Sequence, residues 1–135
     1  MKSYLPIVEV AIENIESTLA SIKEEYLLYK PMDGIFTIGE HLYHIGYSIH
    51  WCIDNLILDQ KYPHLPPLTV NNLPELVRYN REACQRFKQV FMEKDYPIDK
   101  MFYWLEIIDH CTYHRAQVAI YCRLLKISPP PYKFI

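Results

Sequence analysis

Four segments of the chain repeat apolar residues at alternating steps of three and four, the spacing that puts side chains on one face of an α-helix. These segments cover residues 3–20, 37–58, 72–94 and 99–125. Most of the ten prolines fall between or after them, where they would end helices. No segment has the strict alternation typical of a strand. The pattern therefore predicts an all-α protein, built as a four-helix bundle.

Residues that cap helix N-termini mark the start of each predicted helix. They are Ser3, Thr37, Asn72 and Asp99. A glutamate three residues after Thr37 completes a capping box. Ser21 and Glu24 form a similar pair, so we expect the first helix to break near residues 20–21 and a short helix to end before Pro31. Pro6 is tolerated in the first turn of the first helix.

Length and composition exclude several classes of protein. A chain of 135 residues, half of them hydrophobic, is expected to form a single domain over residues 1–135. A net charge of −2 without a cluster of Lys and Arg argues against nucleic-acid binding. No apolar run reaches the roughly 18 residues of a membrane span. Four cysteines without a Cys-x-x-Cys pair, and no signal peptide, lead us to expect a cytoplasmic protein.

The connection between the second and third helices is long. Residues 60–72 contain three prolines and no helical spacing. Short loops force neighbouring helices to be antiparallel, whereas a connection of this length can cross the bundle and leave the two helices parallel. The prolines of residues 128–131 cannot continue a helix, so we expect an extended tail lying across the body.

Two histidines, His110 and His114, lie four residues apart in the fourth helix. Imidazoles at this spacing share a helix face and can bind one transition metal ion. His114 falls on the apolar stripe and His110 at its edge. The alternative to metal binding is that ordinary hydrogen bonds satisfy these two rings, because an unpaired buried polar group costs about 1–3 kcal/mol. In the second helix, His41 or His44 could complete a three-histidine site with open coordination positions, as in catalytic sites.

Other readings of these residues are less favoured. Glu-x-x-His pairs and the His-Glu-x-x-His motif are absent, which excludes di-iron carboxylate and zincin sites. Cys111 lies near His114, but a cysteine in an apolar stripe is usually a packing residue. A polar and aromatic stripe on the second helix is either a solvated flank or subunit contact, or the lining of a pocket. It comprises His41, His44, Tyr47 or Ser48, and Trp51.

Two blocks of the sequence resemble the DinB/YfiT-like family of metalloenzymes. They are Thr37–Ile45 and Asp109–Val118, and the second contains the core His-x-x-x-His-Arg-x-Gln. The closing segment Arg123–Pro130 is similar too, so the resemblance spans nearly the whole chain. It implies a four-helix bundle of up-down-down-up topology, with a long crossover between helices two and three.

The resemblance also implies a metal site. One divalent ion, nickel, zinc, manganese or iron, would be held by His44, His110 and His114. His44 is preferred to His41 because it closes the pattern Ile-Gly-Glu-x-x-x-His. Ala116 stands where the family often has glycine, a change that concerns helix packing rather than ligation.

The resemblance implies thiol-dependent transfer or isomerisation with a low-molecular-weight thiol, and a homodimer. A metal ion that acts as a Lewis acid on a small-molecule substrate would support either thiol S-transfer or hydrolysis, which are the two reactions we expect. The motif contains no acid or base, so a metal-bound water or thiol is the expected reactive group. Glu40 and Glu106 lie one turn before His44 and His110, where we expect solvated charges more than orienting groups. The alternative is a non-catalytic dimeric bundle with a structural or adventitious metal ion.

Overall fold

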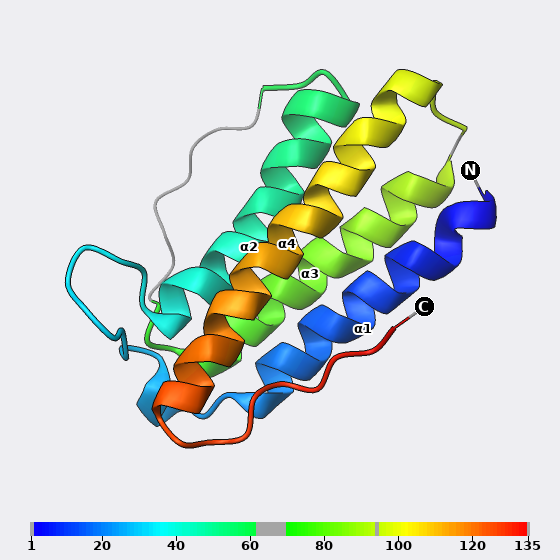
Figure 1. The fold of residues 1–135 in the computed structure, drawn as a ribbon. Coiled ribbons are helices and arrows are strands. Elements are labelled where there is room, and N and C mark those ends of the chain that lie inside the picture. The colour runs from blue at the N-terminus through cyan, green and yellow to red at the C-terminus, as the bar shows by residue number, and fades with distance from the viewer. Residues whose placement is uncertain (1, 62–69, 94, 135) are drawn as a thin grey trace.

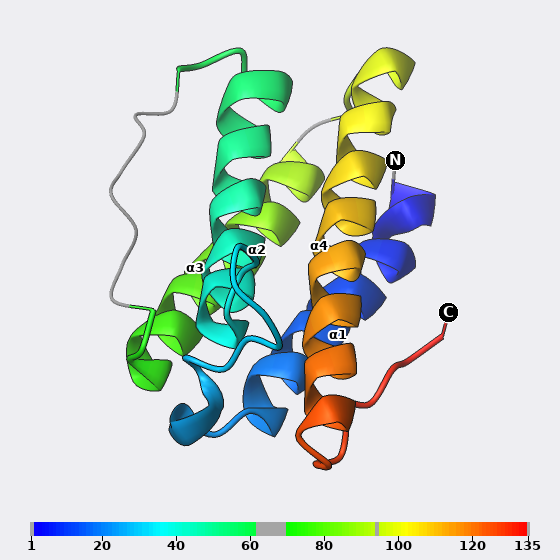
Figure 2. The same ribbon diagram turned by 60° about the vertical axis from the view of Figure 1, so that its left-hand side comes forward.

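The computed structural model describes residues 2–61, 70–93 and 95–134. Its four α-helices pack side by side (Figures 1 and 2), and no strand occurs in these ranges, which confirms the predicted all-α bundle. The elements in chain order are η1 (Lys2–Tyr4), α1 (Leu5–Ser21), η2 (Glu24–Tyr26), α2 (Ile38–Cys52), η3 (Ile53–Ile57), α3 (Leu73–Glu93) and α4 (Ile98–Leu124). Of the helices described, none combines the length and hydropathy that crossing a bilayer requires.

Two of the predicted helix caps are present. The backbone N–H of Glu40 donates to Thr37 Oγ1 at 3.1 Å, and the Glu40 carboxylate accepts from the Thr37 N–H at 2.6 Å. This reciprocal pair satisfies two of the four free N–H groups at the start of α2. At the start of α3, Asn72 Oδ1 accepts from the N–H of Glu75 at 3.0 Å.

The predicted caps at Ser3 and Asp99 are wrong. Ser3 lies inside η1, and α1 starts at Leu5 with no side-chain cap. The backbone of Pro97 is extended, with ψ 155°, and α4 begins directly after it. Proline fixes φ and cannot donate a backbone hydrogen bond, so it sets the helix start and leaves Asp99 inside the first turn.

The end of α1 agrees with the prediction, but the capping box expected there does not form. The Ser21 hydroxyl donates to the carbonyl of Ser17 at 2.7 Å instead of capping a following helix. The short helix expected after it is a single 3₁₀ turn, η2. At the other boundaries, Lys94 and residues 62–69 of the predicted connection lie outside the described residues.

The second helix continues past its regular end. After Cys52 the backbone changes to one π-helical turn, η3, which ends at Ile57, close to the predicted end near residue 58. Asp54 on this turn is buried and forms an ion pair with Arg86 of α3. Nearer the start of α2, Asn80 Nδ2 donates to the carbonyl of Leu42 at 3.0 Å. Earlier residues of α2 thus contact earlier residues of α3, and later residues contact later ones.

The contacts between α4 and α2 follow the opposite order, because the start of α4 contacts the end of the second helix. Near the start of α4, Lys100 Nζ donates to the carbonyl of Leu56 at 2.6 Å, whereas Tyr121 near its end contacts His41. The aromatic centre of the core is Trp104, whose ring stacks on Phe87 with centroids 5.4 Å apart. The buried face of α4 includes His114 and Cys111, which the sequence placed on its apolar stripe. It comprises Trp104, Ile107, Cys111, His114, Arg115, Val118, Tyr121 and Cys122.

The C-terminal tail is extended and lies beside α1 (Figure 1), as predicted. Asn14 exchanges two hydrogen bonds with the backbone of Lys133, at 3.0 and 2.8 Å. Arg115 links the tail to the bundle, because its Nε donates to the Asn14 carbonyl and to Thr18 Oγ1, both at 2.8 Å, and its Nη2 donates to the carbonyl of Pro131 at 3.4 Å.

Candidate metal centre

The three histidines favoured by the sequence come together between α2 and α4. His44 lies in the second turn of α2, and His110 and His114 are one turn apart on α4. One ring nitrogen from each lies within 4.8 Å of the others. His110 Nε2 and His114 Nε2 are 3.2 Å apart. The cluster can therefore hold a metal ion.

The donor geometry fits a divalent ion. Two nitrogens bound at 2.0–2.1 Å to one tetrahedral ion lie about 3.3 Å from each other, close to the separation of the His110 and His114 nitrogens. The ring of His44 is tilted by 59° relative to that of His114, with centroids 4.6 Å apart, and one of its nitrogens lies within 4.8 Å of the other two donors. Imidazole nitrogen suits zinc, nickel, copper and iron.

The surroundings of His44 and His114 favour the neutral imidazole, which is the form that binds metal. Burial, followed by the neighbouring histidines, lowers the pKa of His114 from 6.5 to about 3. Burial and the proximity of His110 also lower the pKa of His44. These rings therefore keep a free lone pair at neutral pH, and in the absence of a cation they rely on hydrogen bonds to satisfy it.

His41, the other candidate from the second helix, is not one of the three clustered donors. Its Nδ1 lies 2.8 Å from Nδ1 of His114, and its Nε2 lies 3.3 Å from the hydroxyl of Tyr121. Burial, with the neighbouring His44, lowers the pKa of His41 to about 4. Tyr121 was missed by the sequence reasoning. Its spacing of seven residues from His114, which puts both side chains on one helix face, was the available signal.

A cavity of about 550 Å³ opens next to the histidines. Most of the residues that line it are aromatic or aliphatic. The lining comprises Pro31, Ile35, Phe36, His41, His44, Tyr113, His114, Gln117, Ile120 and Tyr121. Phe36 comes from the loop before α2, which projects from the bundle beside the start of α2 in Figure 1. Its ring stacks on His114 at 6.2 Å and meets His41 edge-on at 5.4 Å. His41 and His44 are thus pocket-lining residues, whereas Trp51 of the same predicted stripe is 38% exposed.

The other residues considered from the sequence do not contribute donors to the three-histidine cluster. The Glu40 carboxylate is occupied by the cap of α2, and Glu106 is exposed. Cys111 is 3% exposed, and burial raises the pKa of its thiol, so it is a packing residue as expected. The four cysteines are free and buried.

Comparison with known proteins assigns no relative. No family model matches the chain, and neither a curated protein nor a solved structure matches it.

Proposed function

We propose that the chain is a DinB/YfiT-like metalloenzyme that binds one divalent ion, nickel, zinc, manganese or iron, through His44, His110 and His114. The observation that carries the proposal is the convergence of three ring nitrogens within 4.8 Å beside an open cavity. A bound divalent ion would act as a Lewis acid toward a water, carbonyl or thiol that enters the cavity.

The up-down-down-up topology with a crossover between α2 and α3 is part of this proposal. It is supported by the order of contacts, which is the same along α2 and α3 and reversed between α2 and α4. The ion pair of Glu9 with Lys88 and the hydrogen bond from the Leu73 N–H to Glu24 support an antiparallel α1 and α3, because the earlier residue of one contacts the later residue of the other.

The cavity favours a small substrate with an uncharged, partly apolar body. None of its described lining residues is acidic, lysine or arginine. Phe36, Ile35 and Ile120 would contact apolar groups and exclude water, while the Gln117 amide offers a donor and an acceptor for orientation. Thiol S-transfer, with a low-molecular-weight thiol as partner, and hydrolysis are the two reactions we propose for such a substrate.

Metal content tests the site directly. Protein purified without an affinity tag or immobilised nickel should contain about one equivalent of a divalent metal, because three imidazoles lie close enough to bind one ion. His114→Ala should reduce this to less than about a tenth of an equivalent. His50→Gln changes a histidine of the same helix α2 outside the cluster and should leave it unchanged. Wild-type metal content below about a tenth of an equivalent, equal to that of His114→Ala, would refute the metal site.

Activity assays distinguish thiol transfer from hydrolysis. Metal-dependent consumption of a free thiol with an electrophilic acceptor supports transfer, and metal-dependent turnover of uncharged esters or amides supports hydrolysis. If the metal-loaded protein shows neither reaction, the proposed activity is wrong even if the ion is bound.

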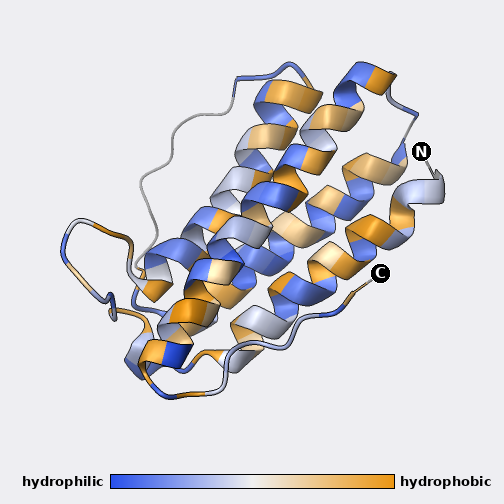
Figure 3. Cartoon of the chain, viewed as in Figure 1, coloured by the Kyte–Doolittle hydropathy of each residue, from blue (hydrophilic) through white to orange (hydrophobic). Residues whose placement is uncertain are grey.

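The second candidate function is self-association without catalysis. It is favoured by exposed apolar side chains on α4. Six large apolar side chains, 46–80% exposed, recur at steps that keep them on one helix face: Ile98, Phe102, Leu105, Tyr113, Ile120 and Leu124. Figure 3 shows hydrophobic segments of α4 interspersed with hydrophilic ones. A large exposed apolar stripe marks an interaction surface, so we propose that α4 pairs with α4 of a second copy in a homodimer.

Sedimentation tests this assembly. Phe102→Glu together with Ile98→Lys should give monomers if the stripe is the interface, because charges would be buried on pairing. A wild-type chain that sediments as a monomer at micromolar concentration would refute the homodimer.

A further inference from the structure

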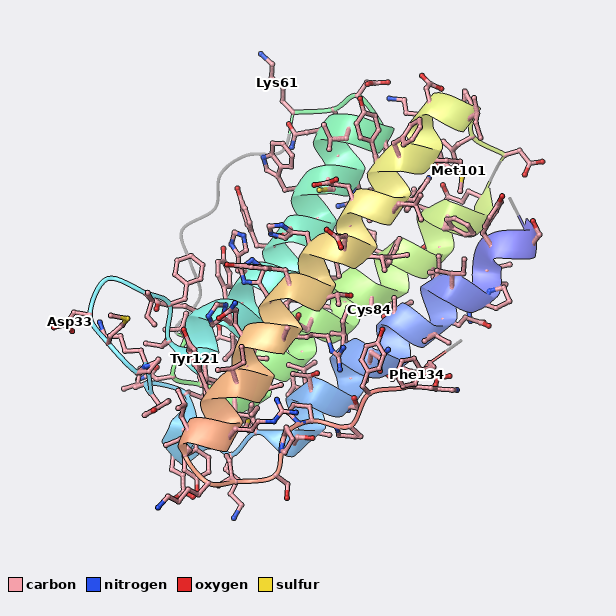
Figure 4. All side chains as sticks on the ribbon, in the orientation of Figure 1. Asp33, Lys61, Cys84, Met101, Tyr121 and Phe134 are labelled. Atoms are coloured by element: carbon pink, nitrogen blue, oxygen red, sulfur yellow. The ribbon has the colours of Figure 1, made fainter. Side chains whose placement is uncertain are left out.

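The ring of His41 connects the histidine cluster to a buried tyrosine. Its Nδ1 is 2.8 Å from His114 Nδ1, and its Nε2 is 3.3 Å from the Tyr121 hydroxyl. His41 is 5% exposed and Tyr121 is 3% exposed, so both side chains are buried. The ring of Tyr121, which is labelled in Figure 4, also meets the His41 ring nearly edge-on, with centroids 5.4 Å apart.

Only two proton arrangements satisfy this chain of neutral groups. Two imidazoles that meet Nδ1 to Nδ1 must share one proton, because two N–H groups or two lone pairs would repel. In the first arrangement His114 Nδ1–H donates to His41, and His41 Nε2–H donates to the Tyr121 oxygen. In the second, the Tyr121 hydroxyl donates to His41 Nε2, and His41 Nδ1–H donates to His114.

The two arrangements have opposite consequences for His114. The first leaves a lone pair on His114 Nε2, the atom that lies 3.2 Å from His110 Nε2. The second places a proton on that atom, where it would block ligation. The tautomer of His114 is therefore coupled to that of His41, the residue that faces its other nitrogen. In metal sites, the partner of a ligating histidine commonly fixes the orientation and the tautomer of its ring.

We propose that His41 is a positioning residue, which holds His114 in the Nδ1–H tautomer by accepting its proton at Nδ1, while Tyr121 holds His41 by accepting from Nε2–H. This inference rests on the proposed metal site, since the free Nε2 of His114 is the atom that would bind the ion. One turn of α2 then supplies both a ligand, His44, and the support for a ligand on α4.

Long-range ¹⁵N–¹H NMR of the histidine rings tests the proposal in the metal-free wild-type chain at neutral pH. The expected result is a proton on Nδ1 of His114 and on Nε2 of His41. A proton on Nε2 of His114, or an even mixture of both tautomers, would overturn the proposal. This measurement needs neither a variant nor activity.

Two substitutions separate positioning from packing. His41→Asn keeps a carbonyl oxygen near the place of Nδ1, and His41→Leu keeps apolar bulk without an acceptor. His41→Leu should weaken Co²⁺ affinity about 10- to 100-fold, and His41→Asn should stay within about threefold of wild type. The Co²⁺ affinity of Tyr121→Phe should lie between the affinities of these two variants. Equal affinity in His41→Leu and His41→Asn would overturn the positioning role. If His41→Leu does not fold, the wild-type tautomers decide alone.

Co²⁺ binding and the tautomer of His114 together distinguish failure of the proposed metal site from failure of the proposed role of His41. A wild-type chain that binds no Co²⁺ but shows His114 protonated on Nδ1 would refute the metal site and support the role of His41. A wild-type chain that binds Co²⁺ with the opposite tautomer in the metal-free state would refute the role of His41 alone.

Discussion

His110 and His114 face each other across one turn of α4, with their Nε2 atoms 3.2 Å apart. Both nitrogens can carry a lone pair, so the contact is stable only when something positive lies between them, either a shared proton or a cation. The other nitrogen of His114 is already engaged by His41. Because a nitrogen of His44 also lies within 4.8 Å of these donors, one cation could satisfy all three rings together.

The first prediction concerns stabilisation by metal. An ion that binds only the folded chain should raise its free energy of unfolding by about 2.7 kcal/mol at a hundredfold excess over Kd. Thermal unfolding with and without Zn²⁺ or Ni²⁺ measures the effect. His110→Ala and His114→Ala should abolish the shift, while His50→Gln should retain it. An equal shift in all four proteins would locate the ion elsewhere.

The second prediction concerns acid. Burial, followed by the nearby Arg86, lowers the pKa of His50 below its ordinary 6.5. The unfolded chain therefore binds more protons than the folded chain below about pH 6.5, and stability should fall as the pH drops. His50→Gln removes this group, so its free energy of unfolding should fall less between pH 7 and 5.5 than that of wild type. Parallel pH dependences would contradict the role of His50. Urea unfolding at each pH provides the measurement.

The third prediction concerns Gly39 at the start of α2. A Cβ at this position would overlap the carbonyl oxygen of Val70 and crowd that of Leu27, and backbone atoms cannot turn aside. Gly39→Ala should therefore cost about 1–3 kcal/mol by overpacking. Gly46→Ala is the matched control, because its Cβ would mainly meet the Tyr79 ring, which can rotate, and its cost should be smaller. Chemical denaturation of both variants measures the difference, and equal costs would be inconsistent with this packing.

The fourth prediction concerns the aromatic core. Trp104 is 1% exposed and packs on Phe87 and Phe91, so Trp104→Ala should cost about 3–5 kcal/mol. Among the described residues its indole Nε1 has no hydrogen-bond partner. Trp104→Phe keeps the stacked ring and removes that buried N–H, so it should cost less than about 2 kcal/mol. Comparable losses in both variants would contradict the expectation that the stacked six-membered ring supplies most of this stabilisation.

Local rules account for much of the fold. The Thr37 capping box and the Asn72 cap follow from side chains that bond to the next turn, so they were predictable from spacing alone. Asp99 was misassigned because an adjacent proline determined the start of α4 instead. The π turn at residues 53–57 could not be predicted, because apolar steps of three and four do not distinguish it from regular helix.

The candidate site was predictable in part. Spacing on one helix placed His110 beside His114, and the resemblance selected His44 over His41 for the facing helix. The contact of His41 with His114 depends on ring rotamers across two helices, which no linear pattern encodes. Phe36 comes from a loop outside every apolar repeat, so its position over the histidines required the structure.

Anomalous diffraction from crystals grown with a divalent metal tests the central claim most directly. The expected result is one strong anomalous peak bounded by the ring nitrogens of His44, His110 and His114, with His41 bonded to His114 and away from the ion. A peak absent from this position, or one coordinated by His41 in place of His44, would contradict it.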